Sequence, residues 1–352
     1  MNFSQCLLQW YAVYGRKDLP WQNPRTPYRV WISEIMLQQT QVKTVIPYFN
    51  RFMQRFPTVS SLASAHDDEV LSYWSGLGYY TRARSIHKTA RLIDDLGRFP
   101  EEVDELVTFP GIGPSTAAAI ASLAFGKPAA ILDGNVRRVL SRIFLVEGWY
   151  QQASVQQKLW ELASVCMPSE DCADYTQAIM DLGATCCTLK NPNCGNCPLQ
   201  AQCKAYKMNR VGELPQKKPA KTKPVKHQQF LLLHNSDFKI YLEKQPPVGI
   251  WGGLWCFPCL DLDSCPQEFL SSNYGITTST CLPLNTMKHT FSHFHLHISV
   301  VELLAKSYSA AKVHESSGKW FALEELARVG LPKPVITILQ TFAQRHQLAF
   351  QM

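Results

Sequence analysis

The sequence contains 352 residues, of which 46% are hydrophobic and 18% are charged. A chain of this length can bury enough surface to form two domains without disulfide bonds. It has no apolar run of about 18 residues, and its first residues lack the basic and apolar regions of a secretion signal. We therefore expect a cytoplasmic protein without a membrane span. The net charge of +7 permits a polyanionic partner but does not require one.

The first part of the chain, up to about residue 205, is predicted to be mostly helical. Apolar side chains recur there at helical spacing, and pairs such as Phe56-Pro57 and Met167-Pro168 separate the helical segments. The predicted helices are 5–14, 28–38, 42–52, 67–73, 84–94, 115–125, 136–146 and 156–166.

The composition changes between residues 204 and 226, where eight Lys or Arg residues stand beside one acidic residue and three prolines. We expect a solvated, extended linker at 206–227. Beyond it, 230–234, 239–244, 252–258 and 293–305 resemble strands, whereas 324–330 and 334–347 resemble helices. Residues 228–350 are therefore predicted to form an α+β domain.

One acidic residue lies within the apolar segment WISEIMLQQTQV at residues 31–42. Trp31, Ile35 and Leu37 bring apolar side chains around the predicted helix, and Glu34 stands between them. A carboxylate in such a place is paired, lies on the exposed side, or is kept for chemistry.

Two further segments combine a turn with the start of a helix. In FPGIGPSTAAAIASLAFG, Gly111 and Gly113 precede Pro114, which suits a first helical position. The helix start offers free backbone N–H groups to a phosphate, although a simple tight turn explains the pattern equally well. In ILDGNVRRVLSRI, Asp133 is placed as the N-cap of a basic helix.

Four cysteines form a cluster with the spacing C-x6-C-x2-C-x5-C. In a reducing compartment such a group indicates a metal site more often than disulfides. Four thiolates can hold tetrahedral zinc or a [4Fe–4S] cluster, and the spacing does not choose between them. The predicted ligands are Cys187, Cys194, Cys197 and Cys203, with the adjacent Cys186 as a bystander.

Several motifs together resemble one known family. LPW at 19–21, SEIMLQQTQV, GLGYY, PGIG, LDGNV and the cysteine spacing are similar to the MutY-type adenine DNA glycosylases, in the helix-hairpin-helix superfamily of endonuclease III. The match continues through WGGLWCFP and HTFSHFH. The resemblance implies an all-α glycosylase domain at 1–205 that includes an iron–sulfur loop at 187–203. A linker at 206–227 and a Nudix-like α+β domain at 228–350 would follow.

The resemblance also implies an activity, namely removal of adenine opposite 8-oxoguanine or guanine in double-stranded DNA during base excision repair. Glu34 would be the general acid, Asp133 the carboxylate that stabilises the sugar cation, and Asn135 a supporting amide. Two carboxylates in different environments can divide this work. Burial should raise the pKa of Glu34, whereas a helix N-terminus should keep Asp133 ionised. A monomer is expected, associated with the nucleoid if the source is bacterial.

The resemblance assigns further residues to DNA and cofactor binding. Gln38, Gln39, Thr40 and Tyr79 would enter the duplex as a wedge, and Trp21 and Gln177 would line the adenine pocket. Gly111, Gly113 and Ser115 would form the hairpin that contacts DNA. Phe291, Ser292 and His293 would form the loop that recognises the oxidised guanine. The cysteine group would hold one [4Fe–4S] cluster instead of zinc, and would order a basic loop in which Lys190, Lys204 and Lys207 bind phosphate.

Three alternatives to a simple adenine glycosylase remain open. An endonuclease III-like lyase would need an amine nucleophile, but Ser115 occupies the position where such enzymes carry lysine, and Arg137 stands where some relatives have lysine. A DNA-binding scaffold would not depend on Glu34. A pyrophosphatase would need a glutamate-rich helix after Gly253, and the sequence there does not contain one.

Two local patterns resemble metal sites but have simpler explanations. His293, His295 and His297 alternate with apolar residues, and a half-exposed strand is favoured over a metal site. Cys256 and Cys259 have no matching ligands nearby in the sequence, so we expect no site there.

Overall fold

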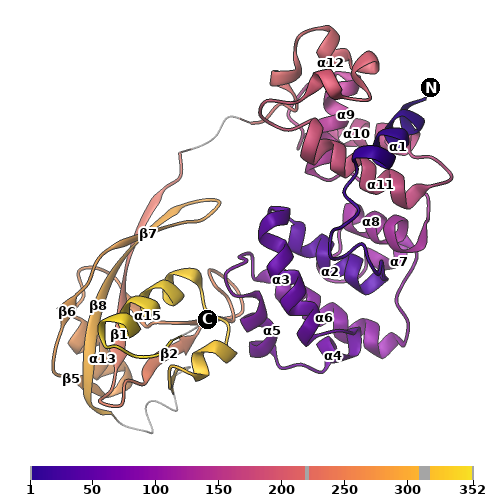
Figure 1. The fold of residues 1–352 in the computed structure, drawn as a ribbon. Coiled ribbons are helices and arrows are strands. Elements are labelled where there is room, and N and C mark those ends of the chain that lie inside the picture. Colours follow the sequence, from indigo (N-terminus) through magenta and orange to yellow (C-terminus); the bar gives the residue numbers. More distant parts are fainter. Residues whose placement is uncertain (1, 219–221, 309–317, 351–352) are drawn as a thin grey trace. The chain divides into compact units, whose positions relative to one another are not determined.

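The computed structural model describes residues 2–218, 222–308 and 318–350, and the chain forms two compact units (Figure 1). Unit 1 contains Met1–Ser64 and Ser85–Ala220, and unit 2 contains Ala65–Arg84 and Lys221–Met352. The segment 65–84 comes from the predicted helical half of the sequence, yet it belongs to the same unit as the C-terminal sheet. Residues 219–221 of the predicted linker lie outside the described residues.

Helices make up unit 1, and every segment predicted as a helix in the first half of the chain falls on a helix of the structure. The main helices are α1 (Phe3–Tyr14), α2 (Pro27–Leu37), α3 (Val42–Arg55), α4 (Val59–Ala63), α6 (Thr81–Leu96), α7 (Val103–Leu106), α8 (Pro114–Phe125), α9 (Gly134–Phe144), α10 (Ala153–Cys166), α11 (Cys172–Asp181) and α12 (Lys204–Lys207). Shorter turns are the π-helix η1 (Leu182–Cys186) and the 3-10 helices η2 (Cys194–Asn196), η3 (Gln200–Gln202) and η4 (Val211–Glu213).

Local sequence explains where the helices that carry the site begin. Thr26 caps α2 by accepting a hydrogen bond from the backbone N–H of Arg29, and Pro27 follows as the first helical residue. Helix α8 starts at Pro114 in the same way, and its buried alanines allow α2 and α11 to pack closely against it. Helix α11 was not predicted from the sequence.

The basic segment is not extended along its whole length. It contains α12 and η4, and the carbonyl oxygen of Leu214 accepts a hydrogen bond of 3.0 Å from Nε of the buried Arg142. Gln216 forms a β-bridge with Trp149, and the first strand already begins at Val225. The prediction of a solvated linker over 206–227 is therefore wrong for these parts of the segment.

Unit 2 contains a mixed sheet with strand order β3-β2-β1-β8-β5. Strands β1 and β8 are parallel to each other, and the other described pairings are antiparallel. The strands are β1 (Val225–His234), β2 (Ile240–Lys244), β3 (Trp255–Cys256), β4 (Cys259–Leu260), β5 (Ile276–Thr278), β6 (Leu282–Pro283), β7 (Met287–Thr290), β8 (His295–Tyr308) and β9 (Gly318–Phe321). The helices are α5 (Asp67–Trp74), α13 (Pro266–Tyr274), α15 (Lys333–Arg345) and the 3-10 turn η5 (Glu325–Arg328).

Helices cover both faces of this sheet because successive side chains of β1 point in opposite directions. Phe230 and Leu232 belong to the core beneath α15, the long yellow helix in Figure 1. Leu231 and Leu233 belong to the core beneath α13. The predicted α+β class is confirmed for this part of the chain.

Three predicted elements of unit 2 need correction. The strand expected at 252–258 is limited to β3, and the helix expected at 324–330 is the 3-10 turn η5. His293 lies in the loop before β8, so only His295 and His297 occupy the strand. The short strand and the 3-10 turn reflect glycines at 252, 253 and 330, which favour turns over regular elements.

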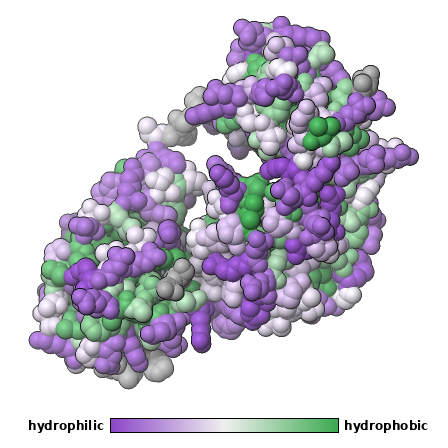
Figure 2. Space-filling view, viewed as in Figure 1, coloured by the Kyte–Doolittle hydropathy of each residue, from purple (hydrophilic) through white to green (hydrophobic). Residues whose placement is uncertain are grey.

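Hydrophilic residues make up much of the visible surface of both units (Figure 2). Within the described ranges, none of the helices combines the length and the apolar character needed to cross a bilayer.

One buried carboxylate ties α15 to the sheet. Glu302 on β8 accepts hydrogen bonds from Nη1 of Arg345 at 2.6 Å and from Nε2 of His346 at 3.1 Å, and Nε2 of His234 lies 3.5 Å away. Burial alone would raise the pKa of Glu302, but the two histidines and the arginine outweigh it and lower the pKa to about 2. The ionised carboxylate therefore contributes to the stability of unit 2.

We predict that Glu302→Gln destabilises unit 2 by about 3 kcal/mol at neutral pH, because Arg345 and the two histidines lose the buried carboxylate that they contact. The parent should lose this contribution as the pH falls from about 4.5 to about 2, since the folded pKa lies below the unfolded value. Thermal unfolding of both proteins across this pH range measures the effect. Glu324→Gln, an exposed control with the same charge change, should behave like the parent; an equal loss in both variants would contradict the prediction.

Candidate active site

A single open groove in unit 1 brings together most of the residues predicted to act in catalysis and base binding. The groove has an empty volume of about 1950 Å³, part of which is open solvent. The predicted residues that line it are Trp21, Glu34, Gln38, Gln39, Thr40, Ser115, Asp133, Asn135 and Gln177. Trp21 comes from the segment between α1 and α2. The others come from α2 and the loop after it, from the starts of α8 and α9, and from the middle of α11.

Glu34 lies on α2 between the buried residues Ser33 and Ile35. Its own side chain is half-buried because it opens into the groove. Burial, and to a smaller extent the charge of Asp133, raises the pKa of Glu34 to about 8. A carboxyl group with this pKa carries a proton at neutral pH and can donate it.

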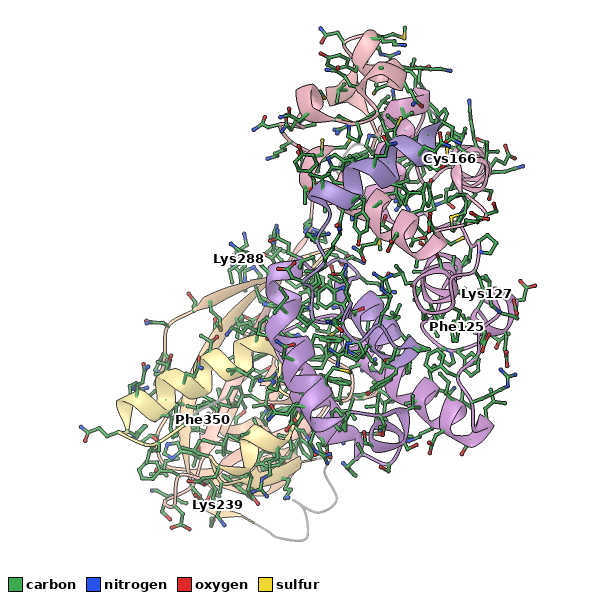
Figure 3. All side chains as sticks on the ribbon, turned by 45° about the vertical axis from the view of Figure 1, so that its right-hand side comes forward. Phe125, Lys127, Cys166, Lys239, Lys288 and Phe350 are labelled. Atoms are coloured by element: carbon green, nitrogen blue, oxygen red, sulfur yellow. The ribbon has the colours of Figure 1, made fainter. Side chains whose placement is uncertain are left out.

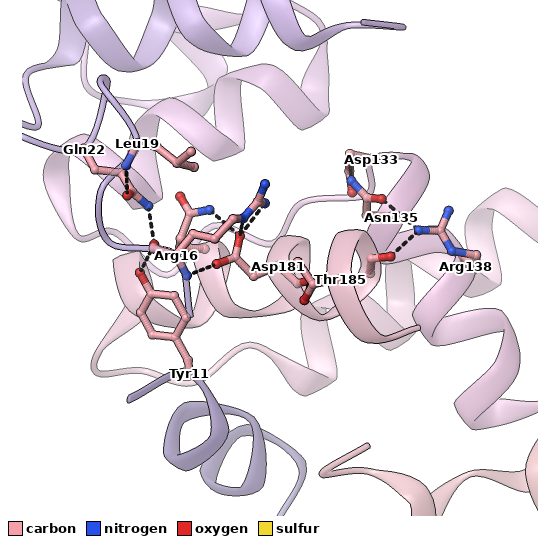
Figure 4. A network of polar contacts seen from close by, with 11 residues as sticks. Tyr11, Arg16, Leu19, Gln22, Asp133, Asn135, Arg138, Asp181 and Thr185 are labelled. Carbon is pink, nitrogen blue, oxygen red and sulfur yellow. Dashed lines mark hydrogen bonds and ion pairs between the residues drawn. The ribbon is translucent and has the colours of Figure 1, made fainter. Parts of the chain in front are cut away.

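Asp133 is the N-cap of α9 and is held by two hydrogen bonds. Its Oδ1 accepts from the backbone N–H of Val136 at 2.8 Å, and its Oδ2 accepts from Nδ2 of Asn135 at 3.0 Å. Arg138 in turn donates to Oδ1 of Asn135 at 2.8 Å and to the carbonyl oxygen of Gly183, as Figure 4 shows. The capping and catalytic interpretations of Asp133 are therefore compatible in one geometry.

Close packing fixes the position of Asn135. A methyl group added at Gly183 would lie 2.5 Å from Cβ of Asn135, so only glycine allows η1 to approach α9 this closely. This requirement was not predicted, because the sequence does not show which helix η1 contacts.

An ion pair at one wall of the groove was also not predicted from the sequence. The fully buried Asp181 accepts from Nη2 of Arg16 at 2.6 Å and from the Arg16 backbone N–H at 2.7 Å. Nε2 of Gln177 donates to the same carboxylate at 2.9 Å, which fixes the orientation of the Gln177 amide. Arg16 itself lines the groove beside Leu19 and Trp21.

The predicted base-pocket and wedge residues of unit 1 differ in burial. Trp21 is buried, and its ring packs edge-on against Phe49 at 5.4 Å. Gln38 donates to Oγ1 of Thr116 at 3.3 Å. Gln39 is exposed and has a left-handed backbone, with φ of 58°, which sets the direction of the loop toward Thr40.

The hairpin before α8 adopts the predicted turn. Gly111 has φ of 82°, and its Cα lies so close to Ser85 that a Cβ would be 2.6 Å from that residue's Cβ. Gly113 is the N-cap of α8. Oγ of Ser115 accepts a hydrogen bond of 3.1 Å from the backbone N–H of Leu132, so it connects the hairpin to the strand-like segment before Asp133. Gly111 and Gly113 do not line the groove.

The four predicted cysteine ligands line a second cavity of unit 1, with about 370 Å³ of empty space. Arg142 contacts one of them, with Nη1 3.3 Å from Sγ of Cys187. Cys186, expected to be a bystander, also lines this cavity, and its Sγ lies 3.3 Å from the carbonyl oxygen of Asn193. Among the described residues, no three His, Cys, Asp or Glu side chains are placed to hold one metal ion.

Four of the predicted DNA-binding residues belong to unit 2. Tyr79 is 47% exposed and lies in the loop between α5 and α6. Phe291, Ser292 and His293 form the loop between β7 and β8. The Phe291 ring stacks on the buried Phe294 at 4.6 Å, whereas Ser292 and His293 are exposed.

The sequence resembles known repair proteins along nearly its whole length. Residues 32–164 match the HhH-GPD superfamily base excision DNA repair proteins, and residues 229–341 match the NUDIX domain. Adenine DNA glycosylase from Buchnera aphidicola subsp. Schizaphis graminum is 41% identical over 342 residues, which is 97% of this chain and 98% of the relative. This chain belongs to the adenine DNA glycosylase family. Adenine DNA glycosylase from Rattus norvegicus is 31% identical and covers 98% of this chain and 78% of its own.

Structural comparison supports the same fold for unit 1. An endonuclease III in a non-covalent complex with DNA has a TM-score of 0.50 and 24% identity, and covers 59% of this chain and 99% of its own. The predicted resemblance, fold class and enzyme class, a DNA N-glycosylase of base excision repair that binds DNA, are thereby confirmed.

We predict that Asp133→Asn lowers the pKa of Glu34 below about 8, because it removes the negative charge that disfavours ionisation of Glu34. Asparagine is a good N-cap, so α9 should keep its start. A carboxyl-selective NMR titration of the whole chain measures the shift. The exposed Asp104→Asn serves as the control, and an unchanged Glu34 pKa in Asp133→Asn would contradict the electrostatic coupling.

Proposed function

We propose that the protein hydrolyses the N-glycosidic bond of adenine paired with 8-oxoguanine or guanine in duplex DNA, without cutting the strand. The observation that carries the proposal is the raised pKa of Glu34 in a groove that also contains the Asp133 carboxylate. Membership of the adenine DNA glycosylase family supports adenine as the base that is removed.

The proposed mechanism divides the work between these two carboxyl groups. Adenine leaves slowly unless it is protonated, so protonated Glu34 donates its proton to an adenine ring nitrogen. The C1′–N9 bond breaks, its electron pair stays on adenine, and the sugar acquires oxocarbenium character. Asp133 stabilises this positive charge. A water molecule then adds to C1′ and releases a proton, which restores protonated Glu34. The adenosine must first leave the base stack, which costs a few kcal/mol.

Ser115 supports simple hydrolysis over a lyase reaction. Its hydroxyl stands at the groove where an amine nucleophile would be needed, and it accepts a hydrogen bond from Leu132. The second domain supports recognition over pyrophosphate hydrolysis. Helix α13, which follows the glycine-rich strand region, contains Glu268 as its one glutamate, so it lacks the glutamate-rich pattern that a Nudix pyrophosphatase needs.

The proposal assigns DNA reading to both units. Gln38, Gln39 and Thr40 of unit 1 and Tyr79 of unit 2 would separate the bases. Phe291, Ser292 and His293 would contact the guanine partner of the adenine. Exposure supports this assignment for Ser292 and His293, which offer hydroxyl and imidazole groups, while stacking of Phe291 on Phe294 holds the loop in place.

The cysteine cavity fits the [4Fe–4S] cluster that we propose as the cofactor. Cys187, Cys194, Cys197 and Cys203 would ligate it, since all four residues line the same cavity and four thiolates can hold such a cluster. Arg142 is buried beside Cys187 and offsets thiolate charge. When bound, the cluster would order the loop from Cys187 to Cys203, which carries the exposed Lys190.

We predict that Glu34→Gln lowers the single-turnover rate of adenine release by about 10²–10⁴-fold, because a carboxamide cannot donate the proton. In the parent, the rate should fall as the pH rises through about 8, where Glu34 loses its proton. The assay uses duplexes with adenine opposite 8-oxoguanine, guanine and thymine, and analyses strand breaks separately.

Gln38→Glu adds a carboxyl group at the groove and tests whether any nearby acid suffices; it should not rescue Glu34→Gln. A rate of adenine release by the parent that does not change as the pH rises through about 8 would contradict the role of Glu34. Equal release opposite thymine would contradict the proposed partner base, and strand breaks with a borohydride-trapped adduct would contradict simple hydrolysis.

We predict that the purified protein contains iron and acid-labile sulfide in the ratio of a [4Fe–4S] cluster. Cys194→Ala should lose most of both, because the site then lacks one thiolate. Elemental and sulfide analysis checks this, and thermal unfolding reports the loss of order. The exposed Cys265→Ala is the matched control. Stoichiometric zinc in the parent would contradict the cluster.

A further inference from the structure

The loop that carries Tyr79 is fastened to the C-terminal sheet within unit 2. On α5, Oδ1 of Asp68 accepts a hydrogen bond of 2.7 Å from Nζ of Lys244 on β2. Nε1 of Trp255 on β3 lies 3.4 Å from the same oxygen, and the Lys244 ammonium lies 5.6 Å from the Trp255 ring. One carboxylate thus joins α5 to two adjacent strands.

At the other end of the loop, Ser75 and Tyr80 both form hydrogen bonds with the backbone of one residue, Leu331. Oγ of Ser75 accepts a hydrogen bond of 3.1 Å from the N–H of Leu331, and the hydroxyl of Tyr80 donates to the carbonyl oxygen of Leu331 at 3.3 Å. Ser75, Tyr80 and Leu331 are all buried. Loss of either partner would leave a buried backbone group of Leu331 without its hydrogen bond.

Close packing surrounds these polar contacts. A Cβ at Gly330 would lie 2.6 Å from Cβ of Leu71 and 2.8 Å from Cδ2 of Leu254, so glycine is required where the chain passes α5. The guanidinium of Arg84 donates to the carbonyl oxygen of Gly252. Residues 252–255 and 330–331 therefore meet the segment 65–84 at several points.

The tip of the loop is exposed, whereas the residues at its base are buried. Tyr79 has a left-handed backbone, with φ of 51°, and remains exposed between buried anchors. The Arg82 guanidinium lies 5.3 Å from the Tyr79 ring and 5.4 Å from the Trp74 ring, and it donates to the carbonyl oxygen of Gly78 at 3.1 Å. An exposed aromatic ring is thus presented on a fixed support.

We propose that Lys244 and Leu331 of the C-terminal domain position the Tyr79 loop. The wedge residue Tyr79 and the 291–293 loop would then both be held by unit 2, the unit that recognises the base pair. This inference rests on the proposed function, in which Tyr79 enters the duplex. An ordered loop loses less conformational freedom when DNA binds, and more of the contact energy remains for base separation. Lys244 and Ser75 would act as positioning residues, because they reach DNA only through Tyr79.

Two variants of the whole chain test the proposal. Lys244→Met removes the charge but keeps much of the side chain's length, and Ser75→Ala removes the hydroxyl that holds Leu331. Both should speed amide hydrogen exchange in residues 75–80 and slow single-turnover adenine release about 3- to 10-fold. Lys239→Met is the matched control, because Lys239 is exposed on the same unit, as labelled in Figure 3.

A double-mutant cycle separates the possible outcomes. If the anchors act through Tyr79, adding Lys244→Met to Tyr79→Ala should cause no further loss of rate. Independent, multiplicative losses, or unchanged exchange at 75–80, would overturn the positioning role and leave the proposed function intact. Full activity of Tyr79→Ala would overturn the wedge itself. A parent that releases no adenine would instead overturn the proposed function.

Discussion

The desolvation of Glu34 is the constraint on which the catalytic unit depends. Helix α2 must be buried on nearly all sides to keep the carboxyl protonated, yet it must leave this one side chain open to the groove. The alanines of α8 meet the first requirement, because they let the two helices approach closely. The loop after α2 and the starts of α8 and α9 meet the second, because they form the open side of the groove.

Asp133 needs the opposite environment, and the start of α9 supplies it. Backbone and amide N–H groups point at its oxygens, so the negative charge is solvated by the protein. The two carboxyl groups also influence each other, since the charge of Asp133 helps to keep Glu34 neutral. Two carboxyl groups with different surroundings therefore line one groove, which is the arrangement that the proposed mechanism uses.

Residues that stand together in a short motif could be singled out from the sequence as candidates, whereas contacts between residues that are distant in sequence could not be predicted. Glu34, Asp133 and the four cysteines stand in local patterns, and most helices of unit 1 follow from apolar periodicity. Arg16 and Asp181 are 165 residues apart, and no local pattern connects them. For the same reason, the sequence did not show that segment 65–84 belongs to unit 2. Periodicity predicts α5 as a helix, but it does not show that the helix packs against a sheet more than 150 residues later in the chain. His293 was wrongly placed on the strand because its alternation with apolar residues begins before His295, the first residue of β8.

The fastening of the Tyr79 loop also bears on how the chain is made. Ser75 is synthesised 256 residues before Leu331, and Asp68 is synthesised 176 residues before Lys244. On the ribosome, α5 and its loop must remain without their final partners until almost the whole polypeptide has emerged. A nascent chain that stops before Gly330 would leave Leu71 of α5 without the close contact that it makes with Gly330 in the finished protein.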